Sequence, residues 1–469
     1  MVQPPSPRWL LRAAAALVLV GLLVPSAISA ATYEPTSLRP GTIEKPANGT
    51  TVISVQGYKF RGKGNPKKPP RLVGVGPRGG LRWSKNGAER DIGWFYDVDP
   101  LPGGTLLVVA TKSNATTTVY RYDPATGERV WTERLATKDT HDVDLLGDDR
   151  LLVADMRNVN ESADRNDARL FVYNRTTDEA VWAFYFRAHY PPSAGGPYGE
   201  RTPYAWIHLN DVDRVTGGTY LASLRNFDQV VLINRSRKEI TGRLGADGTH
   251  DVLYEQHNPQ FLRGEGGRPT VLVADSENDR VVEYALVNGS WERTWALEGF
   301  TWPRDADRLP NGNTLVVDTL NHRVVEVTPT GEVVWEFYAP WAPYDAERVR
   351  HGDEPGGPTI REQNATGAYV VTGSANLTRG ERPAFAKRLA GAFAGTPVGE
   401  EVEWAATRWS HIAPWVRPVW LDPRAFVAAV GAGLFVTAWG VAELVYHRRR
   451  LRGALATAAA RVRDGFSRI

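Results

Sequence analysis

RDADRLPNGNTLVVDTLNHRVVEVTPTGEVVWEF, the sequence of residues 304–337, predicts a run of short β-strands. Aliphatic and β-branched residues fill 315–317, 323–327 and 332–337, separated by the asparagine, glycine and proline residues that suit hairpin turns. A fourth strand is predicted at 305–309. Four strands joined by hairpins form one blade of a β-propeller. A single blade cannot bury both of its faces, so we expect the chain to repeat it.

Five further stretches follow the same pattern: 49–83, 97–131, 141–182, 208–244 and 257–295. The first of them lacks an opening strand. A propeller ring usually closes by taking such a strand from the other end of the chain, and residues 367–373 (GAYVVTG) are expected to supply it. The sequence therefore predicts an all-β fold, a six-bladed β-propeller over residues 49–380.

Charge and composition narrow the possible functions. The chain has 469 residues, no cysteine and a formal net charge of +3. Nine of the 56 Lys/Arg and one of the 53 Asp/Glu lie in residues 1–30 and 447–469, so the rest has a net charge of about −5. A basic nucleic-acid surface is not indicated. Without cysteine, disulfides and thiolate chemistry are excluded.

Both ends of the chain indicate a membrane. Residues 1–30 place Arg8 and Arg12 before an apolar run and are predicted to be a signal peptide or a signal anchor, followed by a linker at 31–48. A second apolar run predicts a transmembrane helix at 424–446, although a buried core helix has the same composition. Its preceding Trp-rich juxtamembrane segment (381–423) and following basic tail (447–469) favour a span with a cytoplasmic C-terminus. We therefore expect a cell-membrane protein whose propeller is extracellular.

Glycosylation motifs agree with that side of the membrane. Eight Asn-x-Ser/Thr sequons occur, at Asn48, Asn114, Asn160, Asn174, Asn234, Asn288, Asn364 and Asn376. Such acceptor sites suit surface loops of secreted chains, so we expect a glycoprotein.

The repeat turns sequence positions into a predicted site. The start of the first strand and the end of the second strand of a blade lie at the same mouth of the central channel. Four strand-one starts are His141, His208, His257 and Arg304, and the matching strand-two ends carry Arg157 and Arg225. Histidines at such positions can simply cap loops. Three in register can instead bind a metal ion or handle an oxyanion and its protons.

At these residues the sequence resembles the arylsulfate sulfotransferases, six-bladed propellers that act without a nucleotide sulfate donor. The likeness covers roughly 97–337 and rests on WIHLND, YLASLRN, EQHNPQFL and VLVADSENDRVVEY. It implies that His257 becomes transiently sulfated, with His208, Asn210, Arg225 and His141 as its partners. The family's bacterial periplasmic members carry an N-terminal sandwich domain and a disulfide, whereas this chain has neither and adds a C-terminal anchor.

Sulfuryl transfer suits these residue types. A neutral His257 can attack sulfur, and Arg225 can hold the sulfate oxygens with planar donors. His208 and His141 can move the phenolic proton, while Asn210, Arg304 and Arg157 are predicted to bind substrate. The expected substrates are a phenolic sulfate ester as donor and a phenol or other hydroxyl as acceptor. No phosphate-binding loop motif appears, and no cofactor or metal is predicted.

Two other functions remain open from the sequence. ENDRVVEY and LNHRVVEVTPTGEVVW also resemble propellers of the NHL type, which implies a non-catalytic ectodomain that binds a surface glycan or protein. The three histidines would also suit a zinc-dependent lyase or hydrolase.

Two further features carry structural expectations. Asp-x-Asp pairs recur at 97/99, 142/144, 211/213 and 305/307, and their constant place in the blade favours turn-capping carboxylates over a calcium site. An insertion at 183–207 precedes His208 and contains Tyr190, Tyr198, Tyr204 and Trp206. Because it feeds into the channel mouth, we expect a lid that stacks on a phenolic ring and excludes water.

Overall fold

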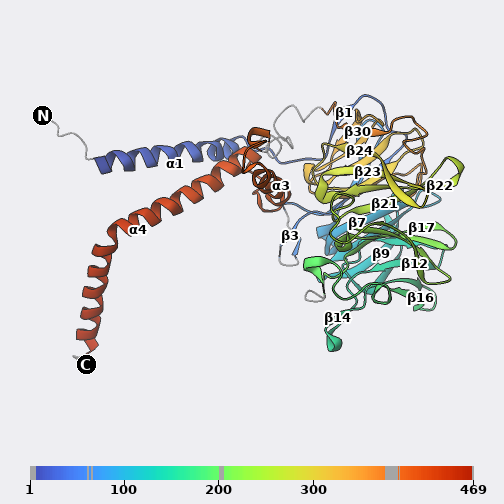
Figure 1. The fold of residues 1–469 in the computed structure, drawn as a ribbon, viewed down its shortest axis with the longest axis horizontal. Coiled ribbons are helices and arrows are strands. Elements are labelled where there is room, and N and C mark those ends of the chain that lie inside the picture. The colour runs from blue at the N-terminus through green and yellow to red at the C-terminus, as the bar shows by residue number, and fades with distance from the viewer. Residues whose placement is uncertain are drawn as a thin grey trace. The chain divides into compact units, whose positions relative to one another are not determined.

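The structure is a computed structural model that describes residues 7–60, 63–64, 67–199, 205–374, 389 and 391–466. The chain divides into two compact units. One comprises Met1–Thr36 and Val416–Ile469, and the other comprises Ser37–Trp415. The second unit contains all the strands labelled in Figure 1.

Six antiparallel blades of four strands form the second unit, which confirms the predicted six-bladed propeller. From the channel outward, the first three blades are β29 (Pro343–Arg348), β2 (Thr51–Val55), β5 (Arg71–Val75) and β6 (Leu81–Asn86); β7 (Ile92–Pro100), β8 (Leu106–Lys112), β9 (Thr116–Asp123) and β10 (Glu128–Lys138); and β11 (Val143–Leu145), β12 (Arg150–Asp155), β15 (Arg169–Asn174) and β16 (Glu179–Tyr185).

The other three blades are β17 (Leu209–Thr216), β18 (Thr219–Leu224), β19 (Gln229–Asn234) and β20 (Glu239–Gly245); β21 (His257–Gly264), β22 (Arg268–Asp275), β23 (Arg280–Val287) and β24 (Ser290–Glu298); and β25 (Pro303–Arg308), β26 (Thr314–Asp318), β27 (Arg323–Val327) and β28 (Val333–Tyr338). The last of these blades contains the four strands predicted from residues 304–337.

The prediction of the ring-closing strand was wrong. β29 completes the first blade by pairing with β2, whereas β30 (Gly367–Val370) pairs in parallel with β24 at an outer edge. The reason is visible in the sequence, because Tyr344-Asp345-Ala346-Glu347 repeats the pattern of Arg304-Asp305-Ala306-Asp307. β1 (Arg39–Ile43) adds to β28, so the sheet begins inside the expected linker at 31–48.

Tryptophans in the outermost strands join neighbouring blades. Each donates its indole N–H to a carbonyl in the next blade's outer hairpin: Trp182 to Arg235, Trp295 to Pro329, and Trp335 to Pro77, at 2.8–3.1 Å. Trp295 and Trp335 are fully buried, so each bond satisfies a polar atom inside an apolar interface. These repeated bonds hold the blades around the channel and so fix the inner strands that carry the site.

Helices occupy the remaining described segments. α1 (Pro7–Ala31) and α4 (Pro423–Phe466) each contain a stretch long and apolar enough to cross a membrane, Pro7–Ala31 and Pro423–Arg448. Either can be an anchor, and the first also fits a signal sequence. Within this unit Arg12 pairs with Glu443 at 2.7 Å, and Ser29 donates to the carbonyl of Trp420. α3 (Gly399–Val416) forms most of the described part of the predicted juxtamembrane segment.

Candidate active site at one mouth of the channel

The innermost strands place aromatic and basic side chains at one level of the channel. In five of the six blades one residue precedes a pair of acidic residues in the pattern x-Asp-x-Asp/Glu. These residues are Tyr96, His141, Asn210, Arg304 and Tyr344. His257 begins the inner strand of the remaining blade. Because equivalent positions of inner strands lie at equal depth, the six side chains surround one mouth.

The structure brings the three predicted histidines together, two of them against Tyr344 and the third against His141. The Tyr344 hydroxyl lies 3.2 Å from His141 Nδ1, and its ring centroid is 6.1 Å from that of His257. His141 packs against Tyr96 in a tilted arrangement with ring centroids 3.9 Å apart, and its centroid lies 5.0 Å from that of His208. The three histidines that were predicted from their positions in the blades therefore form one cluster in the structure.

His257 has a defined hydrogen-bond partner on one ring nitrogen. Its Nδ1 lies 2.8 Å from Ser276 Oγ, and that hydroxyl lies 2.6 Å from the carbonyl of Pro303. Since the serine proton goes to the carbonyl, Ser276 Oγ accepts from Nδ1–H. The lone pair of His257 is thereby assigned to Nε2, which has no hydrogen-bond partner among the described residues. The imidazole is 2% exposed.

Burial keeps this imidazole neutral. The pKa of His257 lies well below its ordinary value because burial disfavours the imidazolium, and the charges of Arg304 and Arg225 add to the effect. The pKa of His208 is lowered well below its usual range for the same reason, with Arg225 and His141 contributing. A neutral ring with its free nitrogen at Nε2 is the form that acts as a nucleophile.

Arg304 is the cation best suited to bind an anion at this mouth. It is 6% exposed, and its guanidinium lies over the rings of Trp302 and Tyr344 at 4.7 and 4.9 Å. It donates to Gln56 Oε1 at 2.6 Å, and within the described residues it forms no ion pair. Burial lowers the pKa of Arg304, which is the effect expected of a desolvated cation that lacks a counter-ion.

The two other predicted arginines already have carboxylate partners. Arg225 pairs with Glu255 and donates to Asn226 at 3.0 Å. Arg157 pairs with Asp139 at 2.6 Å. Both contribute positive charge to the histidine cluster, but their hydrogen-bonding groups are partly occupied. Of these three arginines, Arg304 is the one without a carboxylate partner among the described residues.

Asn210, predicted to bind substrate, is held by a hydrogen bond to the neighbouring blade. Its Nδ2 donates to the carbonyl of Gln256 at 2.9 Å, directly before His257 in the chain. The side chain is fully buried. Asn210 is thus a positioning residue that ties the inner strand of one blade to the segment carrying His257.

The insertion at 183–207 packs into the propeller over most of its described length. Trp206 belongs to the core between two blades and donates to the carbonyl of Ala194 at 3.2 Å, and the partly buried Tyr190 packs against that core. Tyr198 donates to Glu255, the partner of Arg225, at 2.9 Å. Tyr204 lies outside the described residues. The prediction of an aromatic lid was therefore wrong for Tyr190 and Trp206. Packing these rings against the core is more favourable than exposing them above the mouth.

α3 packs beside the candidate site instead. Arg408 pairs with Glu277 at 2.5 Å, and His411 lies 2.9 Å from Asp279. Trp415 packs against Trp302 with centroids 6.1 Å apart. The same Trp302 lies under Arg304 and 6.4 Å from His257. The segment expected to approach lipid headgroups thus forms part of the cover of the site.

Docking of α3 is expected to depend on pH. Burial alone would lower the pKa of His411, but hydrogen bonds to Asp279 and Glu277 raise it to about 9. A pKa raised above that of the unfolded chain stabilises docking below about pH 6.5, and the stabilisation is lost as the pH rises through about 9.

Hydrogen exchange of the α3 amides should therefore be slow at pH 7 and faster at pH 10, after correction for the intrinsic rate. In the His411→Gln variant, the α3 amides should exchange rapidly at both pH values. Equal protection of wild-type α3 at both values would contradict the prediction.

Tyr96, Tyr344 and Ser276 were not among the residues predicted from the sequence. The pattern x-Asp-x-Asp/Glu, read across all inner strands, contained the signal for both tyrosines. Tyr344 was overlooked because the ring-closing strand was assigned elsewhere. Ser276 begins a short helical turn after β22, and no local pattern marks it as a partner of His257.

The acidic pairs do not cap turns. Asp345 accepts from the amide of Val98 at 2.8 Å, and Asp144 accepts from the amide of Arg214 at 2.9 Å. These donors lie in the inner strand of the next blade. The carboxylates therefore join neighbouring inner strands, and they also line the channel beyond the histidine cluster.

The fold and these side chains define a six-bladed β-propeller with a basic, histidine-containing channel mouth. No protein-family model and no curated protein matches the sequence. Similar solved structures include a protein of unknown function from Bacteroides caccae, with 14% identity and a TM-score of 0.42 over 62% of this chain and 93% of that chain. The nidogen/laminin complex has 13% sequence identity and a TM-score of 0.42, over 64% of this chain and 97% of that chain. A streptogramin B lyase has 11% sequence identity and a TM-score of 0.32, over 53% of this chain and 70% of that chain. Likenesses this distant carry no argument about activity.

Proposed function

We propose that the protein is an arylsulfate sulfotransferase that moves a sulfuryl group from a phenolic sulfate ester to a hydroxyl acceptor through a sulfated His257. The observation that carries the proposal is the buried, neutral His257, whose Nδ1 is bonded to Ser276 while Nε2 is left as the nucleophile. An arginine without an ion-pair partner among the described residues stands beside it. The resemblance to the sulfotransferase family supports the same assignment.

In the first half-reaction, Nε2 of His257 attacks the sulfur of the donor. The N–S bond forms while the bond from sulfur to the phenolic oxygen breaks, and the phenolate leaves with the bonding electrons. The ring becomes an imidazolium that carries an SO₃⁻ group, with Nδ1–H still donated to Ser276. Arg304 stabilises the negative charge on the sulfate oxygens.

The phenolate then needs a proton. Tyr344 and His141 form a hydrogen-bonded pair at the same mouth, and together they supply that proton to the leaving oxygen. The acceptor hydroxyl returns a proton to the pair as its oxygen attacks the sulfated histidine. The O–S bond forms, the N–S bond breaks and neutral His257 is restored. Since little covalent chemistry is needed beyond this, positioning and charge stabilisation dominate the catalysis.

Geometry favours this function over zinc chemistry. Four-coordinate zinc holds ligand atoms about 2.0–2.2 Å from the ion, so its ligands lie within about 4 Å of one another. Among the described residues, the group of three or more ligand atoms within 4.8 Å is formed by carboxylates, not by the three histidines. His257 Nδ1 is also engaged by Ser276.

The proposal is tested with the full-length protein in detergent, p-nitrophenyl sulfate as donor and phenol as acceptor. We expect release of p-nitrophenol to accelerate with phenol concentration and phenyl sulfate to form in equal amount. A zinc-selective chelator, 1,10-phenanthroline, should leave the rate unchanged. Release that ignores phenol, or a rate abolished by the chelator and restored by zinc, would contradict the proposal.

A further inference from the structure

Below the histidine cluster, the channel is lined almost entirely by acidic residues. Five inner strands each contribute a pair of carboxylates, and the loop after β29 adds two more. The acidic lining residues are Asp97, Asp99, Asp142, Asp144, Asp211, Asp213, Asp305, Asp307, Asp345, Glu347, Asp353 and Glu354. The inner strand of the fifth blade contributes Asn258, Pro259 and Gln260 instead. This cavity has no lysine or arginine among its lining residues in the described part of the chain.

Several of the lining oxygens have no hydrogen-bond partner. Asp97 Oδ2, Asp211 Oδ2 and Asp307 Oδ2 are unpartnered within the described chain, although these residues are only 9%, 6% and 5% exposed. The amide oxygen of Asn258 is unpartnered as well. A buried carboxylate oxygen without a donor is unfavourable, because desolvation is uncompensated. Unpartnered oxygen acceptors around a cavity whose described lining contains no basic side chain indicate a cation.

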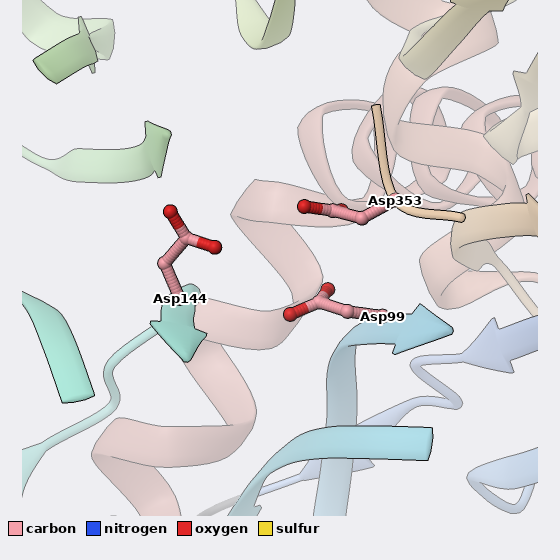
Figure 2. Close-up of side chains that lie close together, drawn as sticks. All are labelled: Asp99, Asp144 and Asp353. Atoms are coloured by element: carbon pink, nitrogen blue, oxygen red, sulfur yellow. The ribbon is translucent and has the colours of Figure 1, made fainter. Parts of the chain in front are cut away.

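Three of the carboxylates converge from separate parts of the chain. Asp99 comes from β7, Asp144 from β11, and Asp353 from the loop after β29 (Figure 2). One oxygen of each lies within 4.8 Å of the others. Figure 2 shows these carboxylates directed toward a common space. Asp144 also accepts from the amide of Arg214, so its orientation is fixed by the neighbouring blade.

Crowding makes the ring of carboxylates electrostatically unfavourable on its own. Twelve acidic side chains line one cavity, and ligand oxygens of Asp99, Asp144 and Asp353 lie within 4.8 Å of one another. Like charges at such a separation repel one another strongly where water is partly excluded. Either a counter-cation or protons shared between carboxylates relieve this repulsion.

We propose that the channel binds a calcium ion through Asp99, Asp144 and Asp353. Calcium takes six to eight oxygen ligands in flexible geometry, whereas magnesium requires a tighter octahedron and retains water. Further oxygens from the surrounding ring complete such a shell. A bound cation neutralises the acidic ring, which includes residues one and three positions after His141 and after Arg304 in the chain. It would favour the approach of an anion to that mouth, but the proposal stands whether or not the mouth transfers sulfate.

Calcium binding is measured with the full-length protein in detergent at pH 7.5, after exchange against EGTA. We expect titration calorimetry to show binding, and excess calcium to raise the Tm by at least about 2 °C, more than equal magnesium. Asp353→Asn and Asp144→Asn should each weaken binding at least about tenfold. Asp149→Asn serves as the matched control, because this exposed residue lies on the hairpin of the same blade as Asp144.

Asp353 lies in a loop, so its variant tests the site even if Asp144→Asn does not fold. Absence of calcium heat and of any Tm shift would overturn the proposal and favour shared protons. Binding that is unchanged in Asp353→Asn and in folded Asp144→Asn would also overturn it. Loss of binding in these variants, with Asp149→Asn unaffected, would support it. Sulfotransferase activity enters none of these readouts, so failure of the proposed function would be seen separately.

Discussion

His257→Ala is expected to reduce sulfuryl transfer by at least about 10³-fold, because the variant lacks the nucleophile that forms the covalent intermediate. Ser276 holds Nδ1 of His257 and so fixes the tautomer that leaves Nε2 as the nucleophile. The measurement is kcat/KM for phenol-dependent release of p-nitrophenol. Thermal unfolding of the variant verifies that the propeller is intact.

Two controls separate chemistry from structure. His351→Ala removes a histidine from the loop after β29 and should leave the rate within about twofold, the scatter expected of a residue outside the catalytic machinery. Ser276→Ala keeps the nucleophile but loses the acceptor for Nδ1–H, so part of the population carries the proton on Nε2 and we expect a smaller loss than in His257→Ala. Near wild-type transfer by a folded His257→Ala protein would contradict the assignment.

Arg304→Lys is expected to lower kcat/KM for sulfate esters by about 10²–10³-fold. The guanidinium lies over the rings of Trp302 and Tyr344 and offers planar donors, whereas an ammonium is a point charge that cannot reproduce this geometry. The assay compares p-nitrophenyl sulfate turnover in the two proteins. We expect the substitution to lower kcat/KM more than the Tm, because in the described part of the chain Arg304 donates a hydrogen bond to Gln56 alone.

Arg225→Lys is the informative comparison. From the sequence alone Arg225 was the predicted sulfate-binding arginine, but the structure pairs it with Glu255. We therefore expect a smaller loss of activity than in Arg304→Lys, together with a lower Tm, because an altered partner leaves Glu255 buried and poorly paired. If Arg225→Lys lost far more activity than Arg304→Lys without a change in Tm, the assignment of the two arginines would be reversed.

The fold was predictable because its signals are local. Hairpin residues such as Asn311 and Gly312, and the strands between them, recur at a regular spacing along the chain. A single blade cannot bury both of its faces, so the repeat predicts a ring of blades. Ring closure is not local. GAYVVTG has strong β-propensity, yet β29 closes the ring because Asp345 and Glu347 repeat the inner-strand pattern.

The site was predictable in part. Blade phase places His141, His208 and His257 at one mouth, and the structure brings them together. Which arginine is left without a carboxylate could not be read from the sequence, because Glu255 and Gln56 meet their partners only in the folded ring. The packing of α3 beside the site could not be predicted from the sequence either. Trp415 suggests a membrane interface by composition, whereas in the structure it packs on Trp302.

The central claim is tested most directly by trapping the sulfated enzyme. Full-length protein is mixed with p-nitrophenyl sulfate without an acceptor, digested at neutral pH and mapped by mass spectrometry. The account predicts one added SO₃ group on the peptide that contains His257, lost when phenol is added before digestion. Turnover that proceeds with no sulfated His257, or with the SO₃ group on another residue, would contradict it.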